Sequence, residues 1–158
     1  MRLHPPGFGT RIRTAFCTLL LACLAGCGDP ETPEAQVRAT LAAIEAAAEA
    51  RDIGGVMDHV SSQFRDAYGR DGPALSRYVR GYFVANQSLH LLSRIEALEF
   101  PTPEEARAKV TVGVVSREAA QTNAWNLAAE IRDFDLTFVR EDGEWKVAHA
   151  KWGGRNGG

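Results

Sequence analysis

Apolar residues recur with helical spacing in the first half of the chain. One stripe repeats at steps of four, three and four residues: Val37, Leu41, Ile44 and Ala48. Thr32 can cap the start of this helix, and Pro33 suits its first turn. The pattern predicts a helix over residues 33–51.

Two further helices and one extended piece follow. Asp52 can cap a short helix that ends near Val60, although Gly54 and Gly55 weaken it. Residues 62–68 are expected to be extended, with Phe64 pointing inward. Asp71-Gly72-Pro73 starts a third helix, whose apolar face has the spacing of one buried stripe: Leu75, Tyr78, Val79, Tyr82 and Phe83.

After Asn86 the period changes from helix to strand. Residues 89–100 are β-like but apolar on both faces, whereas residues 106–114 alternate strictly between apolar and polar positions. Phe134, Leu136 and Phe138 alternate in the same way with Asp133 and Asp135, which predicts that both aspartates face outward. Asp142-Gly143 predicts a hairpin turn before a last strand over residues 144–152. Helices followed by an antiparallel meander predict an α+β fold.

The first 27 residues have a different character. Arg2, Arg11 and Arg13 precede an apolar run of about 11 residues, which is within the range of a signal peptide and too short to span a bilayer as a helix. The run ends in Leu24-Ala25-Gly26-Cys27, which resembles the lipobox of bacterial lipoproteins. That resemblance implies cleavage before Cys27 and attachment of a diacylglycerol to its sulfur, with fatty acyl chains such as palmitate. An uncleaved anchor helix and a plain secretory signal cut after Gly26 are the two alternatives.

These features divide the chain into four parts. Residues 1–26 are expected to be the signal peptide, residues 27–33 the lipidated cysteine and its tether, residues 34–152 one domain, and residues 153–158 a disordered tail. We expect the mature protein in the cell envelope, held at the membrane by its lipid. Gly28 after the cysteine resembles outer-membrane sorting, which implies a position facing the periplasm, whereas Asp29 leaves inner-membrane retention open.

The charge and the cysteine and histidine content of the chain limit which partners, disulfides and metals we expect. Loss of residues 1–26 removes three arginines and leaves 15 Lys and Arg against 20 Asp and Glu, a net charge of −5. An acidic domain of this kind is a poor candidate for binding nucleic acid. The mature chain retains only Cys27, so it cannot form an internal disulfide. The histidines lack metal-ligand spacing, and we expect neither a metal nor another cofactor.

The predicted domain resembles the nuclear transport factor 2-like superfamily. The resemblance rests on three segments in order: residues 51–57, Val60-Ser61-Ser62-Gln63-Phe64-Arg65-Asp66, and the closing hairpin over residues 138–147. It implies N-terminal helices packed in the concavity of a curved antiparallel sheet, the cone of that superfamily. A cystatin-like or other α+β roll is the alternative.

Enzymes of this superfamily, such as steroid isomerases and polyketide cyclases, place a carboxylate or histidine base inside an apolar cone. Strand alternation puts His149 on the face of Trp145 and Val147, so we expect it to point inward. It could act as an acid or base with Tyr82 as a hydrogen-bond donor, or it could be a core histidine held by one hydrogen bond. The predicted ligand pocket comprises five residues: Tyr78, Tyr82, Phe134, Trp145 and His149.

The same alternation places Ala148, Ala150 and Trp152 on the outer face of the sheet. Small residues beside a tryptophan suit contact between two sheets, which predicts a homodimer through this face, unless the C-terminal tail covers it.

Three functions are compatible with these patterns. The favoured one is a non-catalytic, membrane-anchored module that binds a small apolar ligand or a protein partner. The second is an isomerase, dehydratase or cyclase that uses His149 as its base. The third is a structural subunit of an envelope complex that makes contact through the outer face of the sheet.

Overall fold

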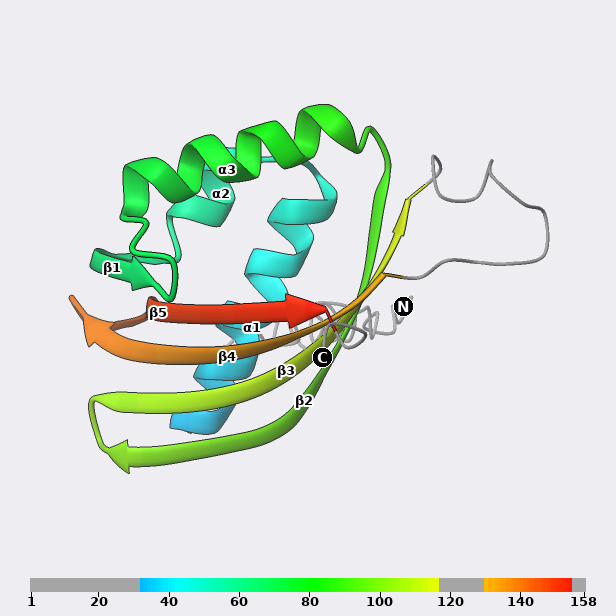
Figure 1. The fold of residues 1–158 in the computed structure, drawn as a ribbon. Helices are drawn as coiled ribbons and strands as arrows, with labels where there is room; N and C mark the ends of the chain where they lie inside the picture. Colours follow the sequence, from blue (N-terminus) through cyan, green and yellow to red (C-terminus); the bar gives the residue numbers. More distant parts are fainter. Residues whose placement is uncertain (1–31, 117–129, 155–158) are drawn as a thin grey trace, which may run out of the picture.

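Three helices lie in the concavity of a curved five-stranded sheet (Figure 1). The computed structural model describes residues 32–116 and 130–154. The elements, in chain order, are α1 (Pro33–Glu49), α2 (Ile53–Met57), β1 (Val60–Asp66), α3 (Gly72–Ala85), β2 (Leu89–Thr102), β3 (Glu105–Ser116), β4 (Glu130–Glu141) and β5 (Glu144–Gly154). The predicted α+β class, with helices packed in a curved antiparallel sheet, is confirmed.

A polar side chain caps each helix at its predicted start. The Thr32 hydroxyl accepts a hydrogen bond from the Ala35 amide, and Asp52 and Asp71 accept equivalent bonds from Gly55 and Ala74. Gly55 has a steric role, because a Cβ atom there would come within 2.8 Å of Asp52 Oδ2. The glycine that lowers the helix propensity of α2 therefore also lets its cap form.

The sheet is a meander with one additional parallel strand. Its order is β1-β5-β4-β3-β2, and β2 to β5 pair antiparallel with their neighbours in sequence. β1 lies parallel to β5 at the opposite edge, with Val60 beside Val147. Asp142 and Gly143 both have positive φ values, 52° and 84°, as the predicted two-residue turn between β4 and β5 requires.

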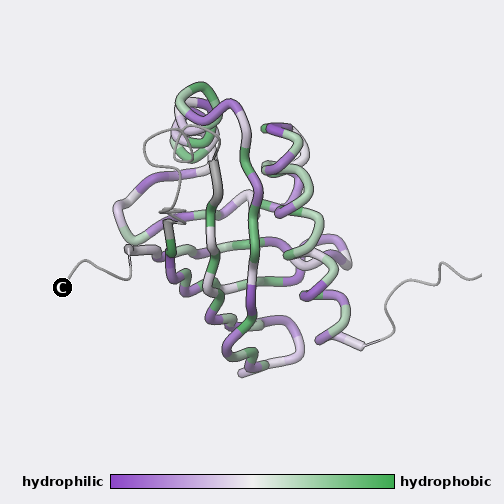
Figure 2. The backbone as a smooth tube through the Cα atoms, turned by 90° about the vertical axis from the view of Figure 1, so that its right-hand side faces the viewer, coloured by the Kyte–Doolittle hydropathy of each residue, from purple (hydrophilic) through white to green (hydrophobic). Residues whose placement is uncertain are grey.

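The core lies between the helices and the concave face of the sheet. Figure 2 shows hydrophobic and hydrophilic positions alternating along the strands. Val37, Phe64, Phe138 and Trp145 are buried, with at most 2% of each side chain exposed. Asp133 and Asp135 are exposed on the outer face, as predicted.

A β-bulge in β5 overturns the predicted faces of its second half. Phe138 pairs with Val147 but Thr137 pairs with His149, so Ala148 is an extra residue on β5. One extra residue reverses the alternation, because successive side chains point to opposite faces. His149 is therefore exposed and Ala150 is buried. The predictions that His149 faces inward and that Ala150 and Trp152 face outward are wrong.

Several predicted segments lie outside the described residues. These include the signal peptide, Cys27 and the final four residues. Gly153 and Gly154, predicted as part of a disordered tail, belong to β5. Within residues 32–116 and 130–154, no helix is long and apolar enough to cross a membrane.

Candidate functional site

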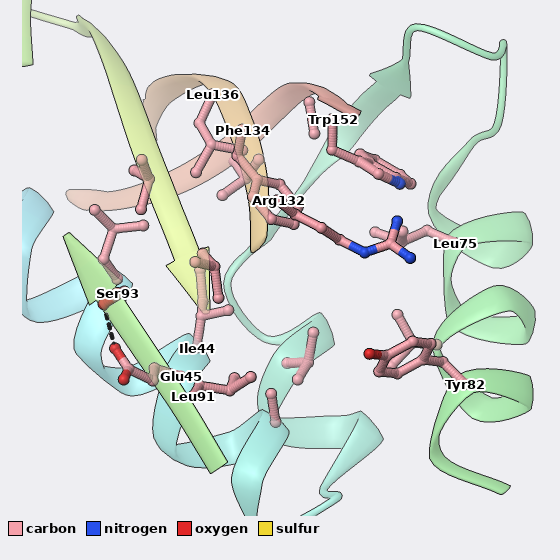
Figure 3. Close-up of a pocket in the computed structure, with 18 of the residues that line it drawn as sticks. Ile44, Glu45, Leu75, Tyr82, Leu91, Ser93, Arg132, Phe134, Leu136 and Trp152 are labelled. Carbon is pink, nitrogen blue, oxygen red and sulfur yellow. Dashed lines mark hydrogen bonds between the residues drawn. The ribbon is translucent and has the colours of Figure 1, made fainter. Parts of the chain in front are cut away.

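A cavity of about 280 Å³ lies between the helices and the concave face of the sheet (Figure 3). Its walls come from all three helices and all five strands, and nearly all of the exposed atoms in it are apolar. The helices contribute Leu41, Ile44, Glu45, Ala48, Val56, Leu75, Tyr78, Val79, Tyr82 and Phe83. The strands contribute Val60, Phe64, Leu89, Leu91, Ser93, Val110, Val112, Val114, Arg132, Phe134, Leu136, Val147, Ala150 and Trp152.

The wall formed by α1 and the edge strand β2 carries one carboxylate. Glu45 Oε2 accepts a hydrogen bond from the Ser93 hydroxyl, and Glu49 Oε1 accepts one from the Leu91 amide. β2 is at the edge of the sheet, so the Leu91 amide has no neighbouring strand on that side. The two glutamates therefore hold α1 against this edge.

The opposite side of the cavity carries a cation. Arg132 extends from β4 towards α3, and its guanidinium group lies between Trp152 and Tyr82 (Figure 3). Its Nε atom is buried. The hydroxyl group of Tyr82 is directed into the cavity from α3 (Figure 3).

A second, more open hollow of about 520 Å³ adjoins the cavity. The two share Tyr78, Arg132 and Trp152, and the second adds Tyr68, Arg70, Gly153 and Gly154. We call it the outer hollow. Its wall and that of the cavity are continuous through the three shared side chains.

Arg70 is held in the outer hollow by three aromatic rings. Its Cζ atom lies 4.9 Å from the ring centroid of Tyr68, 4.3 Å from that of Tyr78 and 4.9 Å from that of Trp152. These distances are typical of cation–π contacts. Its Nε atom also donates to Asp66 Oδ2 at 2.6 Å.

Asp66 is a buried carboxylate with several donors around it. Its Oδ1 atom accepts hydrogen bonds from the backbone amides of Tyr68 and Arg70, each at 2.8 Å. Burial alone would raise the pKa of Asp66, but these bonds and the Arg70 guanidinium outweigh it and hold the pKa below its usual value. Asp66 is therefore a charged anchor for the wall of the outer hollow.

Three of the five residues predicted to line the pocket do so, and two do not. Tyr78, Tyr82 and Phe134 line the cavity. Trp145 is buried elsewhere in the core, where its Nε1 atom donates to Gln36 Oε1 at 3.2 Å and its ring meets Phe100 edge-on. His149 is outside the cone on the outer face of the sheet.

Sequence reasoning missed two residues that line both hollows. Arg132 is two positions before Phe134, so the alternation that places Phe134 inside also places Arg132 inside. That signal was available in the sequence. Strand alternation predicts the wrong face for Trp152, because the bulge at Ala148 shifts the alternation before this residue.

The part of the chain that the structure describes has no cluster of metal ligands. No group of three or more His, Cys, Asp or Glu residues there could hold an ion.

Comparisons with known proteins address the fold. No protein-family model matches the sequence, and no curated protein matches it. Solved structures do match. A presumed scytalone dehydratase from Novosphingobium aromaticivorans has a TM-score of 0.64 at 13% identity, over 75% of this chain and 81% of that one.

Two other solved structures also match the fold of this chain. A presumed dehydratase of the nuclear transport factor 2-like family from Streptomyces avermitilis has a TM-score of 0.64 at 13% identity, over 80% of this chain and all of that one. A presumed calcium/calmodulin-dependent protein kinase type II association domain from Thiobacillus denitrificans has a TM-score of 0.59 at 16% identity, over 77% and 93%. At these identities the likeness concerns the fold alone. The described residues therefore have the nuclear transport factor 2-like fold, an α+β cone around an apolar cavity.

Proposed function

We propose that this chain is a membrane-anchored envelope lipoprotein whose cone binds a small apolar molecule without transforming it. The observation that carries the proposal is the cavity of about 280 Å³, whose exposed atoms are almost all apolar. Small-molecule sites are typically concave and mostly apolar, with a few polar groups that fix the ligand's orientation. Arg132 and Tyr82 provide such groups here (Figure 3).

The chemistry of the lining favours binding over catalysis. Among the described residues that line the cavity there is no histidine and no aspartate, and the carboxylate of Glu45 is engaged by Ser93. His149, the base of the isomerase hypothesis, is on the outer face of the sheet. A base must be within hydrogen-bond reach of the proton it removes. His149 does not meet this condition for a substrate inside the cone.

The anchoring part of the proposal rests on the sequence. Leu24-Ala25-Gly26-Cys27 supports lipidation of Cys27, and α1 begins at Pro33. The five residues between the cysteine and the helix, residues 28–32, span at most about 20 Å when extended. Such a tether would keep the cone close to the lipid headgroups, on the outer membrane and facing the periplasm.

Photolabelling in vesicles tests the binding of an apolar molecule. The protein, purified with the N-terminus that the cell produces, is reconstituted into phosphatidylcholine vesicles with a diazirine-bearing dodecanol, a neutral probe. We expect labelled peptides from β3, β4 and α3, which line the cavity. Labelling confined to peptides before residue 32 would contradict the proposal, because it would show contact with the bilayer alone.

Two substitutions on α1 distinguish binding of the probe in the cavity from binding at the protein surface. Ala48 lines the cavity, whereas Ala46 is exposed on the same helix. Ala48→Phe fills part of the cavity and should reduce labelling of the cavity peptides severalfold. Ala46→Phe adds the same ring outside the cavity and should leave the labelling unchanged. Equal labelling in both variants would show that the probe binds elsewhere.

A further inference from the structure

We infer that the cone selects an anionic amphiphile, whose apolar chain fills the cavity and whose carboxylate or phosphate head is bound by Arg132. This inference rests on the proposed binding of an apolar molecule and adds the chemistry of the head group. It follows from where the charges are placed around the two hollows.

The cavity has its two charges on opposite sides. Among the described residues that line it, only Glu45 and Arg132 carry a formal charge. Glu45 is beside the edge strand and is engaged by the Ser93 hydroxyl. Arg132 is on the side of the cavity that continues into the outer hollow (Figure 3). A ligand whose head points towards the outer hollow therefore meets the cation and not the carboxylate.

The outer hollow extends this positive region. Among its described lining residues there are two arginines, Arg70 and Arg132, and no acidic residue. Asp66 holds the Arg70 guanidinium at 2.6 Å. The aromatic rings around Arg70 fix its guanidinium in place. Arg132 lines both hollows, so its guanidinium is the one closest to the apolar chain of a ligand, and Arg70 adds a second guanidinium further out.

The guanidinium group suits an anionic head better than a neutral or cationic one. It presents five donors in a planar fork, so it can bind two oxygens of a carboxylate or phosphate and still contact the protein. Apolar surroundings strengthen such charged hydrogen bonds relative to water. A hydroxyl head offers one acceptor without charge, and an ammonium head is repelled. The hydroxyl of Tyr82 points into the same cavity (Figure 3).

Competition between ligands of one chain length tests the inference. The protein in phosphatidylcholine vesicles is labelled with a diazirine-bearing dodecanoate at mildly alkaline pH, where the probe is ionised. Dodecanoate, dodecyl phosphate, dodecanol and dodecyltrimethylammonium then compete, each compared at its measured membrane concentration. We expect the two anions to compete at concentrations at least about tenfold lower than the alcohol, as charged hydrogen bonds imply. The better of the two anions identifies the head as a carboxylate or a phosphate.

Two arginine variants assign this preference to Arg132. Arg132→Gln should weaken competition by the anions about ten- to a hundredfold and leave dodecanol nearly unchanged. Arg77 is exposed on α3 and lines neither hollow, so Arg77→Gln removes a charge of the same sign without affecting the preference. If Arg132→Gln does not fold, the four competitors on the unmodified protein still decide whether the head is anionic.

Different outcomes would overturn the preference for an anionic head and the proposed binding of an apolar molecule. Equal competition by dodecanol and dodecanoate would overturn the anionic preference while leaving apolar binding intact. Strongest competition by the ammonium compound would also overturn it and would indicate Glu45 as the charged partner. A preference that persists in Arg132→Gln would overturn the role of Arg132. If neither the neutral nor the anionic probe labels the cavity peptides, the proposed function itself fails.

Discussion

Asp66 shows how one buried carboxylate positions a wall of the site. It is only 4% exposed, and both of its oxygens accept hydrogen bonds from the turn that follows β1. Arg70, held by Asp66, then lies against Tyr78 and Trp152, which line both hollows. Removal of this one charge therefore loosens a turn, a cation–π cluster and part of the candidate site together.

We expect Asp66→Asn to destabilise the fold by about 1.5–3 kcal/mol at neutral pH, because hydrogen bonds to a charged group are lost. The pKa of Asp66 is below its usual value in the folded protein. Its contribution is therefore fully present above the unfolded pKa of about 4 and is lost as the pH falls through the lower folded pKa. The difference in unfolding free energy between wild type and variant should shrink below about pH 4.

Urea denaturation across this pH range measures the effect. Asp135→Asn is the matched control, since Asp135 is exposed on the outer face of β4, and it should change stability by less than about 0.5 kcal/mol. A deficit in Asp66→Asn that stays constant down to low pH would refute the role of the Asp66 charge.

Trp145 carries a second residue-level prediction. It is 2% exposed, and its ring nitrogen donates to Gln36, which also accepts from Arg140. Trp145→Ala should cost about 3–5 kcal/mol of unfolding free energy, because it leaves a cavity in the core. Trp145→Phe keeps most of the packing but loses the hydrogen bond, which should lower the unfolding free energy by about 1 kcal/mol. Chemical denaturation of both variants separates packing from hydrogen bonding, and equal costs would show that packing is not the main term.

At the level of the elements, the sequence predicts the features that depend on residues close together in the chain. The caps at Thr32, Asp52 and Asp71 depend on residues three positions apart, and the turn at Asp142 depends on two residues. All of these were readable from the sequence. The bulge at Ala148 was not, because Ala-His-Ala suits either face of a sheet and the choice depends on pairing with β4. The parallel pairing of β1 with β5 is likewise a tertiary contact without a local signal.

The bulge gives a prediction at this scale. Deletion of Ala148 would restore strict alternation without changing any face, because Val147 would still pair with Phe138 and His149 with Thr137. Residues 150–152 would keep their pairing with β4, and Ala150 its pairing with Asp66 on β1, so the deletion variant should still unfold cooperatively in chemical denaturation. Ala148→Ser keeps the register and should change stability little, since Ala148 is only half-buried. Loss of cooperative unfolding in the deletion variant, with the serine variant intact, would show that β5 needs the bend that the bulge introduces.

At the scale of the whole molecule, the cavity combines residues that no single segment of the sequence brings together. Tyr78 and Tyr82 come from α3, Phe134 and Arg132 from β4, and Trp152 from the end of β5. Helical and strand periodicity predicted which side chains face the core for the first three of these residues. Whether the core would be filled or hollow depends on how far α1 and α3 stand from the sheet, which no periodicity specifies. Sequence alone therefore predicted the cone and part of its lining, but not the volume or the position of the cation.

The proposed position of this cone at a membrane depends on Cys27. Cys27→Ser should prevent acylation and maturation and release the protein from the membrane fraction, because an apolar run of about 11 residues is too short to span a bilayer. Cys23→Ser is the matched control: it removes a thiol from the same segment, in the part expected to be cleaved away, and should leave lipid labelling unchanged. Metabolic labelling with palmitate and membrane fractionation measure both outcomes, and lipid labelling that persists in Cys27→Ser would refute the anchor. Because the described residues contain no cysteine, the Cys27→Ser cone should retain its fold, so any loss of ligand labelling in that variant would reflect distance from the membrane and not damage to the cavity.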